Sequence, residues 1–299
     1  MSTGLLLGLF ATFAWGCVDV TAALAARRLG SLRVLAGSQA VSVVALVLLI
    51  AADPSRLGSD AIAGILAGLP LGIVAAAAYL AYFTALRIGP LSIVSPIIVA
   101  YGGTTVVLAV LLRGETLLPA QATGAAIATA GVILAGLVFD EGSWRGARLV
   151  GPGVLVAVLT TLLFAVVTIL LASPIREHGW LPVVLGSRLA NAAAGAVLLG
   201  FALRTEAPRL RPLLRPGGAV TRSVAGLVAV AGVCDMLGFG AYAVGLEVAP
   251  VWLVGLASSF GPVMVVMYAV GRLGERLRRT QWLGLVLIGA GVVVLAVAG

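Results

Sequence analysis

The sequence predicts an all-α polytopic membrane protein with ten transmembrane helices, arranged as two five-helix repeats of inverted topology. Three observations predict it: the composition, the number of long apolar runs and an internal repeat. Of the 299 residues, 61% are hydrophobic and 10% are charged, whereas soluble domains carry about 25% charged residues. Together with a mean hydropathy of +1.17, this excludes soluble enzymes, nucleic-acid binders and disordered chains, because each of these needs far more polar surface.

Ten apolar runs are long enough to cross a bilayer, which takes roughly 20 residues per helix. Backbone in lipid must satisfy its own hydrogen bonds, so each run is predicted to be a helix. Charged residues or Pro and Gly separate most of them, as at Arg27-Arg28 and Asp53-Pro54. The runs lie at about 4–25, 33–51, 63–86, 89–112, 119–138, 149–172, 181–203, 223–246, 249–271 and 281–298.

The second part of the chain repeats the first. A shift of 160 residues places Gly114-Glu115-x-Leu117 on Gly274-Glu275-x-Leu277, and a shift of 149 places Gly37-Ser38 on Gly186-Ser187. The repeat predicts a first half at 1–138, a connecting loop at 139–148 and a second half at 149–299. Because five is odd, the second half crosses the membrane in the opposite sense. Such inverted repeats are typical of alternating-access transporters.

The arginines predict the orientation. All 19 basic residues are arginine. With ten spans, the loops on one side hold 15 of them and the opposite loops hold 3. The positive-inside rule then places the arginine-rich loops in the cytoplasm and both termini outside. We expect a multi-pass protein of the plasma membrane, the inner membrane of a bacterial cell.

Two carboxylates lie inside predicted spans, Asp19 in the first and Asp235 in the eighth. A charged side chain there costs about 2.5–3.5 kcal/mol on insertion scales and must face a cavity or a partner. Burial penalises the ionised form, so each could bind a proton near neutral pH. Each could also be a counter-charge for the amino group of a substrate. The structural alternative is a hydrogen bond to a neighbouring helix.

Helical spacing selects aromatic residues near these carboxylates. Trp15 shares a face with Asp19, and Phe239 and Tyr242 share one with Asp235. The 160-residue shift maps the second face onto Tyr79 and Tyr82. Aromatic residues at equivalent positions of two halves suit the wall of a substrate site. For the tyrosines nearest the span ends, Tyr82 and Tyr242, an interfacial aromatic belt is an equal alternative.

Serines beside prolines inside spans are further candidates, because a proline frees a backbone carbonyl for substrate. They are Ser95 in the fourth span and Ser258 and Ser259 in the ninth, and helix packing through small residues is the alternative. Arg188 in the seventh span could hold a substrate carboxylate, but a structural ion pair, for example with Asp235, or snorkelling is favoured. Glu275, like its counterpart Glu115, is predicted to form a salt link at a helix end.

Several of these features occur together in one known family. Trp15-Gly16 in the first span, a fourth span that starts at Pro90, and Gly-Glu-x-Leu after spans four and nine resemble the EamA branch of the drug/metabolite transporter superfamily. The resemblance covers nearly the whole chain. It implies a central cavity lined mainly by spans 1, 3, 4, 6, 8 and 9, and transport of small metabolites, commonly amino acids and their derivatives, usually outward. Many relatives keep their termini in the cytoplasm, so the arginine pattern leaves the direction of transport open.

These observations predict a secondary active transporter of small polar metabolites, amino acids or their derivatives, working by alternating access with a proton as coupling ion. A proton-coupled efflux transporter for organic cations or drugs is the alternative, favoured by the two buried aspartates. A non-transporting membrane scaffold is the further alternative. No phosphate-binding loop or metal-ligand spacing occurs, so no cofactor and no enzyme activity are expected. The partners expected are a small-molecule substrate, protons and the lipid bilayer, but no nucleic acid, and a monomer suffices because one chain supplies both halves.

Overall fold

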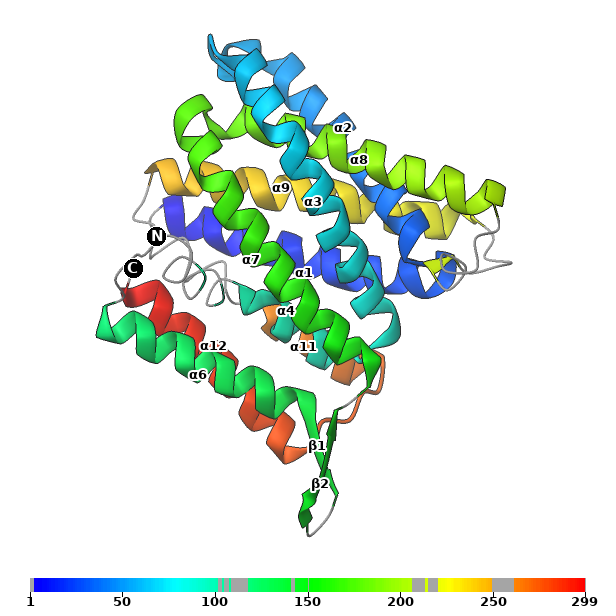
Figure 1. Cartoon of the computed structure of the whole chain (residues 1–299), viewed down its shortest axis with the longest axis vertical. Coiled ribbons are helices and arrows are strands. Elements are labelled where there is room, and N and C mark those ends of the chain that lie inside the picture. The colour runs from blue at the N-terminus through cyan, green and yellow to red at the C-terminus, as the bar shows by residue number, and fades with distance from the viewer. Residues whose placement is uncertain are drawn as a thin grey trace.

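The computed structural model describes residues 3–101, 104, 108, 118–140, 143–149, 151–205, 213–214, 220–248 and 261–298. Figure 1 labels its elements. In the first half they are α1 (Thr3–Leu29), α2 (Ser31–Ala52), a 3-10 helix η1 (Pro54–Leu57), α3 (Ala61–Ile88), α4 (Leu91–Val99) and α6 (Pro119–Gly136). Two strands follow, β1 (Leu137–Asp140) and β2 (Ser143–Leu149). The second half holds α7 (Pro152–His178), α8 (Trp180–Thr205), α9 (Arg222–Val248), α11 (Gly261–Arg272) and α12 (Arg279–Ala298).

Each of the ten predicted apolar runs contains a helix, which confirms the helical fold. Six of the described helices, α1, α2, α3, α7, α8 and α9, are long and apolar enough to cross a membrane. The expected number of ten transmembrane helices is not confirmed. In particular, α4 and α11 fill only part of the predicted spans 89–112 and 249–271, whose other residues lie largely outside the described part of the chain.

The segment between the halves differs from the prediction of a loop at 139–148. Strands β1 and β2 pair antiparallel there, with Leu137 opposite Leu149 and Val138 opposite Arg148. The sequence assigned Leu137 and Val138 to the end of the fifth span because they continue an apolar run. Leu-Val-Phe also suits a strand, since β-branched and aromatic residues favour extended backbone. The all-helical fold class therefore needs one correction, a two-stranded hairpin between the halves.

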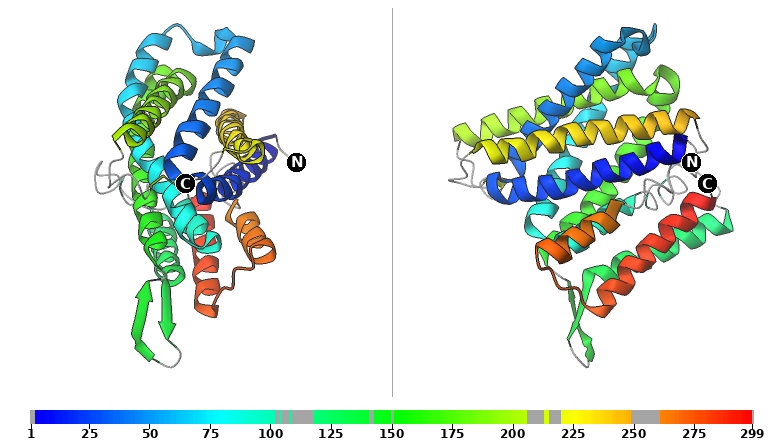
Figure 2. Two further views of the ribbon diagram at one scale, coloured as in Figure 1. Left: turned by 90° about the vertical axis from the view of Figure 1, so that its right-hand side faces the viewer. Right: turned by 180° about the vertical axis from the view of Figure 1, so that it is seen from behind.

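The helices of the two halves pack against one another in pairs. The first helix of the first half, α1, packs along α9, the third of the second half, and α3 packs along α7 in the same way. Other helices contact their own counterparts: α2 contacts α8, α4 contacts α11, and α6 contacts α12. Figures 1 and 2 show α1 beside α9 and α6 beside α12. In each of these pairs, one helix belongs to the first half and the other to the second, as the internal repeat suggests. The contact between the halves is therefore extensive.

Small residues bring α3 and α8 unusually close together. A Cβ atom at Gly68 would lie 2.1 Å from the carbonyl oxygen of Val183, and one at Gly72 would lie 2.2 Å from that of Ser187. From the other helix, a Cβ atom at Gly186 would lie 2.0 Å from the carbonyl oxygen of Ile65. Membrane helices commonly associate through such small residues, because they let the backbones approach. This packing brings the middle of α8, which carries Arg188, against α3.

The surface has the opposite composition to that of a soluble protein. Long apolar side chains point outward and are more than half exposed, among them Phe13, Leu48, Ile62 and Val197. Many of the buried positions in α1 and α3 are alanine or glycine instead. Such a surface suits a surrounding of lipid, in which apolar side chains need no burial.

Three arginine-bearing segments lie on the side opposite the two termini. In Figure 1 the start of α1 and the end of α12 lie on the left, whereas the ends of α1 and α8 and the hairpin lie on the right and lower right. Those right-hand segments carry Arg27, Arg28, Arg204 and Arg148. For these three segments, the arginines lie opposite the termini. Which of the two sides faces the cytoplasm stays a prediction.

Candidate functional site

A buried ion pair lies where four helices from both halves meet. Arg188 of α8 donates from Nη1 to Oδ2 of Asp235 in α9, at 2.6 Å, and the two side chains are only 8% and 9% exposed. The same Nη1 lies within hydrogen-bond distance of Gln39 Oε1 in α2 (2.9 Å) and of the Tyr79 hydroxyl in α3 (2.8 Å). The Tyr79 hydroxyl lies 3.2 Å from both carboxylate oxygens of Asp235. Arg188 therefore lies inward as an ion-pair partner and does not snorkel.

Asn191 extends this network by one turn of α8. Its Nδ2 donates to Gln39 Oε1 at 3.0 Å. Its Oδ1 is buried and has no hydrogen-bond partner among the described residues. A buried carbonyl oxygen normally accepts a hydrogen bond. Among the described residues, this oxygen is therefore an acceptor of the network that is not in use.

A second buried carboxylate has partners of a different kind. Asp19 of α1 accepts hydrogen bonds from the hydroxyls of Tyr82 in α3 and Ser95 in α4. In the part of the chain that the structure describes, no arginine forms an ion pair with Asp19. Two sequence candidates, Tyr82 and Ser95, thus meet a third, and all three belong to the first half.

Aromatic rings lie between the two carboxylates. Tyr79, which contacts Asp235, and Tyr82, which contacts Asp19, pack edge to face with ring centroids 6.1 Å apart. Phe164 of α7 packs against both, at 5.3 Å from Tyr79 and 5.8 Å from Tyr82. We call the groups around the two buried aspartates the two acidic clusters: one is Asp235 with Arg188, Gln39, Tyr79 and Asn191, and the other is Asp19 with Tyr82 and Ser95. The two clusters are neighbours, because Tyr79 and Tyr82 lie on one face of α3. That face is the one that the repeat selected in the sequence.

The remaining sequence candidates lie apart from these clusters or outside the described residues. The rings of Trp15 and Tyr242 pack at 5.6 Å, which joins α1 to α9. Phe239 packs against Trp180 at 6.1 Å, in an apolar cluster that includes Met236. The predicted site residues Ser258 and Ser259 lie outside the described residues.

Three residues of the site were not among the predicted site residues. Gln39 and Asn191 are polar side chains inside predicted spans, and the 149-residue shift maps Gln39 onto Arg188. Their polarity could have identified both residues, and the match to Arg188 is a second signal for Gln39. Phe164 gave no signal, because one phenylalanine in an apolar span is indistinguishable from a lipid-facing residue.

A separate contact joins the halves at the arginine-rich helix ends. Glu275, which follows α11, accepts hydrogen bonds from the backbone N–H groups of Leu91 and Ser92 (3.0 and 2.9 Å) and from the Ser92 hydroxyl (2.6 Å). Arg27 at the end of α1 lies 3.8 Å from the same carboxylate and donates to the Gly89 carbonyl at 3.1 Å. The first N–H groups of a helix lack intrahelical partners and favour an anion. This is the helix-end link that was expected for Glu275.

We expect Glu275→Gln to lower the free energy of unfolding by about 2 kcal/mol, because hydrogen bonds to a charged group contribute about 1.5–3 kcal/mol. A glutamine amide cannot accept all three bonds and carries no charge for Arg27. Thermal unfolding of the purified protein in detergent measures the change. Glu177→Gln is the matched control, since the Glu177 side chain is 67% exposed. Equal melting temperatures for the two variants would contradict the prediction.

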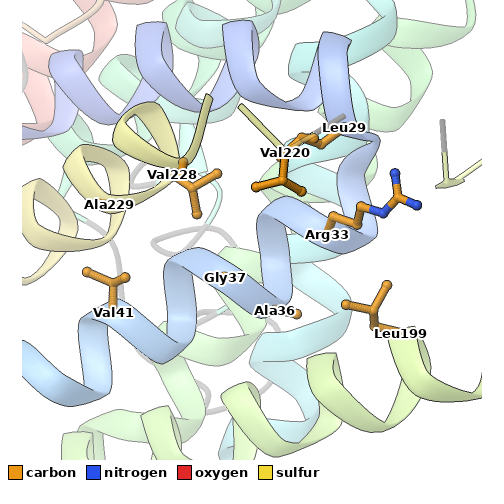
Figure 3. A pocket seen from close by; sticks show the side chains of 10 residues that line it. Leu29, Arg33, Ala36, Gly37, Val41, Leu199, Val220, Val228 and Ala229 are labelled. Atoms are coloured by element: carbon orange, nitrogen blue, oxygen red, sulfur yellow. The ribbon is translucent and has the colours of Figure 1, made fainter. Parts of the chain in front are cut away.

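The pocket shown in Figure 3 lies elsewhere. It has a volume of about 520 Å³ and lies among α1, α2, α8 and the start of α9. Its lining is apolar apart from Arg33 and includes Leu29, Val41 and Val228. None of the residues of the two acidic clusters lines it. Its lining therefore differs from that of the central cavity that the resemblance implies, which is lined mainly by spans 1, 3, 4, 6, 8 and 9.

The comparison with protein families decides what kind of protein carries this site. The model of the EamA-like transporter family matches residues 2–137 and 151–297. The chain belongs to the EamA-like transporter family. The resemblance seen in the sequence is thereby confirmed. This EamA-family chain is a membrane transporter of the drug/metabolite type, built from two repeats, and its family consists of transporters and not of enzymes.

Two further comparisons concern curated proteins and solved structures. No curated protein matches the chain. A solved structure described as "Crystal structure of protein" is 21% identical to this EamA-family chain, with a TM-score of 0.64. The match covers 97% of this chain and 95% of that one. At this identity the likeness shows a shared fold and carries no information on the substrate.

Proposed function

We propose that this EamA-family chain is a secondary active transporter that exports amino acids or their derivatives by alternating access, coupled to a proton. The buried Arg188–Asp235 pair, held by Gln39 and Tyr79 from the other half, is the observation that carries the proposal. In transporters with inverted repeats, the substrate binds near the midplane at the interface of the repeats. A buried ionic network at that interface marks a substrate pathway better than a structural element, because charges in a membrane are costly.

The chemistry of the network suits a zwitterion. A guanidinium binds a carboxylate through two parallel N–H groups, so Arg188 fits the carboxyl end of an amino acid. The Asp235 carboxylate and the face of the Tyr79 ring both attract an ammonium group. The Oδ1 of Asn191, which has no hydrogen-bond partner among the described residues, can accept from an N–H donor. A zwitterion brings both charges, so it can exchange partners with the internal pair without leaving either residue unpaired.

Alternating access requires the contacts between the halves to break on one side at a time. The Glu275 link joins α11 of the second half to α4 and α1 of the first, so opening this side requires its release. In the orientation that we propose, the arginine-rich side faces the cytoplasm of a bacterial cell, which is supported by the positive-inside rule. A monomer suffices for this cycle, because one chain contains both halves.

The proposal is tested with the purified protein in two steps. A thermal-shift screen compares free amino acids with their amides, esters and decarboxylated amines, because ligands that bind only the folded state raise the melting temperature. Compounds that stabilise the protein are then tested for counterflow in proteoliposomes. We expect stabilisation and counterflow from amino acids with both charges, and little of either from their amides or amines. A panel without any stabilising or exchanging amino acid would contradict the proposal.

One observation favours a second function, the efflux of organic cations. Asp19 has no arginine partner among the described residues. Its partner Tyr82 packs against the rings of Tyr79 and Phe164. A carboxylate next to aromatic faces is a recognised arrangement for cationic ligands. Adding tetraphenylphosphonium to the same screen separates the two functions. Stabilisation by this cation and not by amino acids would favour efflux of cations.

A further inference from the structure

We infer that the two buried carboxylates have different tasks: Asp19 binds the coupling proton, whereas Asp235 stays ionised and belongs to the substrate site. The inference deepens the proposed function and rests on it for the meaning of the proton in transport. The proton site itself can be measured on protein that transports nothing. The step is the transfer of one proton from water to the Asp19 carboxylate, which becomes a neutral carboxylic acid.

Asp235 is held in its ionised state by its neighbours. Its Oδ2 lies 2.6 Å from Arg188 Nη1, inside a network that is almost fully buried. Arginine keeps its charge in proteins. A proton on Asp235 would therefore leave a guanidinium buried without a counter-charge, which is strongly unfavourable. Tyr79 adds a hydroxyl on the same carboxylate. These hydrogen bonds and the ion pair thus favour the charged form.

The partners of Asp19 can form hydrogen bonds with either its ionised or its protonated carboxyl group. The hydroxyls of Tyr82 and Ser95 can donate to an ionised carboxylate, and by rotation of an O–H bond one of them can accept from a protonated one. The hydrogen bonds of the cluster therefore persist when the charge changes. No arginine of the described residues lies close enough to Asp19 to offset the desolvation cost of its ionised form. A buried carboxylate with only neutral partners is the kind that takes up a proton.

The surroundings of Asp19 add little net charge. The ionisable groups on α1 and on the helices packed around it include the thiols of Cys17 and Cys234, several tyrosines and the Asp235–Arg188 pair. They also include arginines near helix ends, which are Arg27 and Arg28 on α1, Arg33 on α2, Arg87 on α3, Arg222 on α9 and Arg272 on α11. Because these arginines lie near helix ends, the charged groups near the middle of the described helices around Asp19 are Asp235 and Arg188, whose charges oppose each other. The tyrosines are Tyr79 and Tyr82 on α3, Tyr101, Tyr242 on α9 and Tyr268 on α11.

Infrared difference spectroscopy tests the assignment directly. The full chain is reconstituted in lipid and titrated from pH 9 to pH 5, and the C=O stretch of protonated carboxylic acids is recorded. We expect a band from a buried acid in the wild-type protein, absent in Asp19→Asn and present in Asp235→Asn. Asp53→Asn is the control for an exposed carboxylate and should leave the band unchanged.

Milder variants cover the case in which an aspartate variant does not fold. Tyr82→Phe and Ser95→Ala each remove one hydroxyl from Asp19 and should shift the frequency of the band. Tyr242→Phe removes a tyrosine hydroxyl that does not contact Asp19, so it should not.

Three results would overturn the inference: a band that persists in Asp19→Asn, a band that is lost only in Asp235→Asn, or no band in the wild type. A protein that transports no amino acid but keeps the Asp19 band would contradict the proposed function and not the proton site.

Discussion

Arg188→Met is expected to abolish amino-acid counterflow and to destabilise the folded protein by about 3–5 kcal/mol, the range found when one partner of a buried ion pair is removed. The variant leaves the Asp235 carboxylate buried, with the Tyr79 hydroxyl as its remaining described partner. The guanidinium also contacts Gln39, so α2 loses a link to α8 and α9. Unfolding of the purified protein in detergent and counterflow in proteoliposomes measure the two effects.

The double variant Arg188→Met/Asp235→Leu separates folding from binding. Replacing both members of a buried pair by apolar residues of similar volume is often neutral or stabilising. We therefore expect most of the stability to return while counterflow stays absent. Arg56→Met is the matched control, because the Arg56–Asp53 pair is exposed and such pairs contribute about 0–1 kcal/mol. If Arg188→Met were as stable as Arg56→Met, the network would not contribute to the stability of the fold.

Gly186→Ala should have the second large effect. Its new Cβ would lie 2.0 Å from the carbonyl oxygen of Ile65, which is backbone and cannot rotate away. The helices α3 and α8 must then separate, and overpacking of this kind costs about 1–3 kcal/mol. Arg188 follows Gly186 by two residues, so the separation also moves the guanidinium away from Tyr79. We expect a lower melting temperature and reduced counterflow.

Gly200→Ala is the control on the same helix. A Cβ at Gly200 would meet no atom of another described helix within 4 Å. Alanine is a better helix former than glycine by about 1 kcal/mol, so this variant should be as stable as the wild type or more so. If the two alanine variants melted at the same temperature, the close approach of α3 and α8 would not contribute to stability.

The helices could be predicted from the sequence because the bilayer leaves few alternatives. A long apolar run in lipid must be a helix, since only a helix satisfies its own backbone groups. The predicted run 181–203 therefore corresponds to α8 (Trp180–Thr205), and 33–51 corresponds to α2 (Ser31–Ala52). The same criterion failed at the hairpin, where Leu137 and Val138 extend an apolar run but lie in a strand. Hydropathy does not distinguish an apolar helix end from an apolar strand.

The candidate site could be predicted in part, because buried charges stand out in an apolar sequence. Asp19, Asp235 and Arg188 were identified by their cost in a membrane. Which of them pair depends on how each helix is rotated about its axis, and the sequence left the pairing of Arg188 open. Phe239 illustrates the limit: it follows Asp235 by one helical turn, yet its ring packs against Trp180.

The hydrogen bond between Gln39 and Arg188 has a consequence for symmetry. The two residues occupy equivalent positions of the two repeats and touch each other, so they lie where the pseudo-two-fold axis passes. In a molecule of two identical halves, two guanidiniums would meet there and repel. The position equivalent to Asp235 is Ala75, which carries no charge. A homodimer would offer its ligand two equal orientations, whereas in this chain the Arg188–Asp235 pair belongs to one half alone, so a polar ligand bound to it at the proposed site would have one preferred orientation.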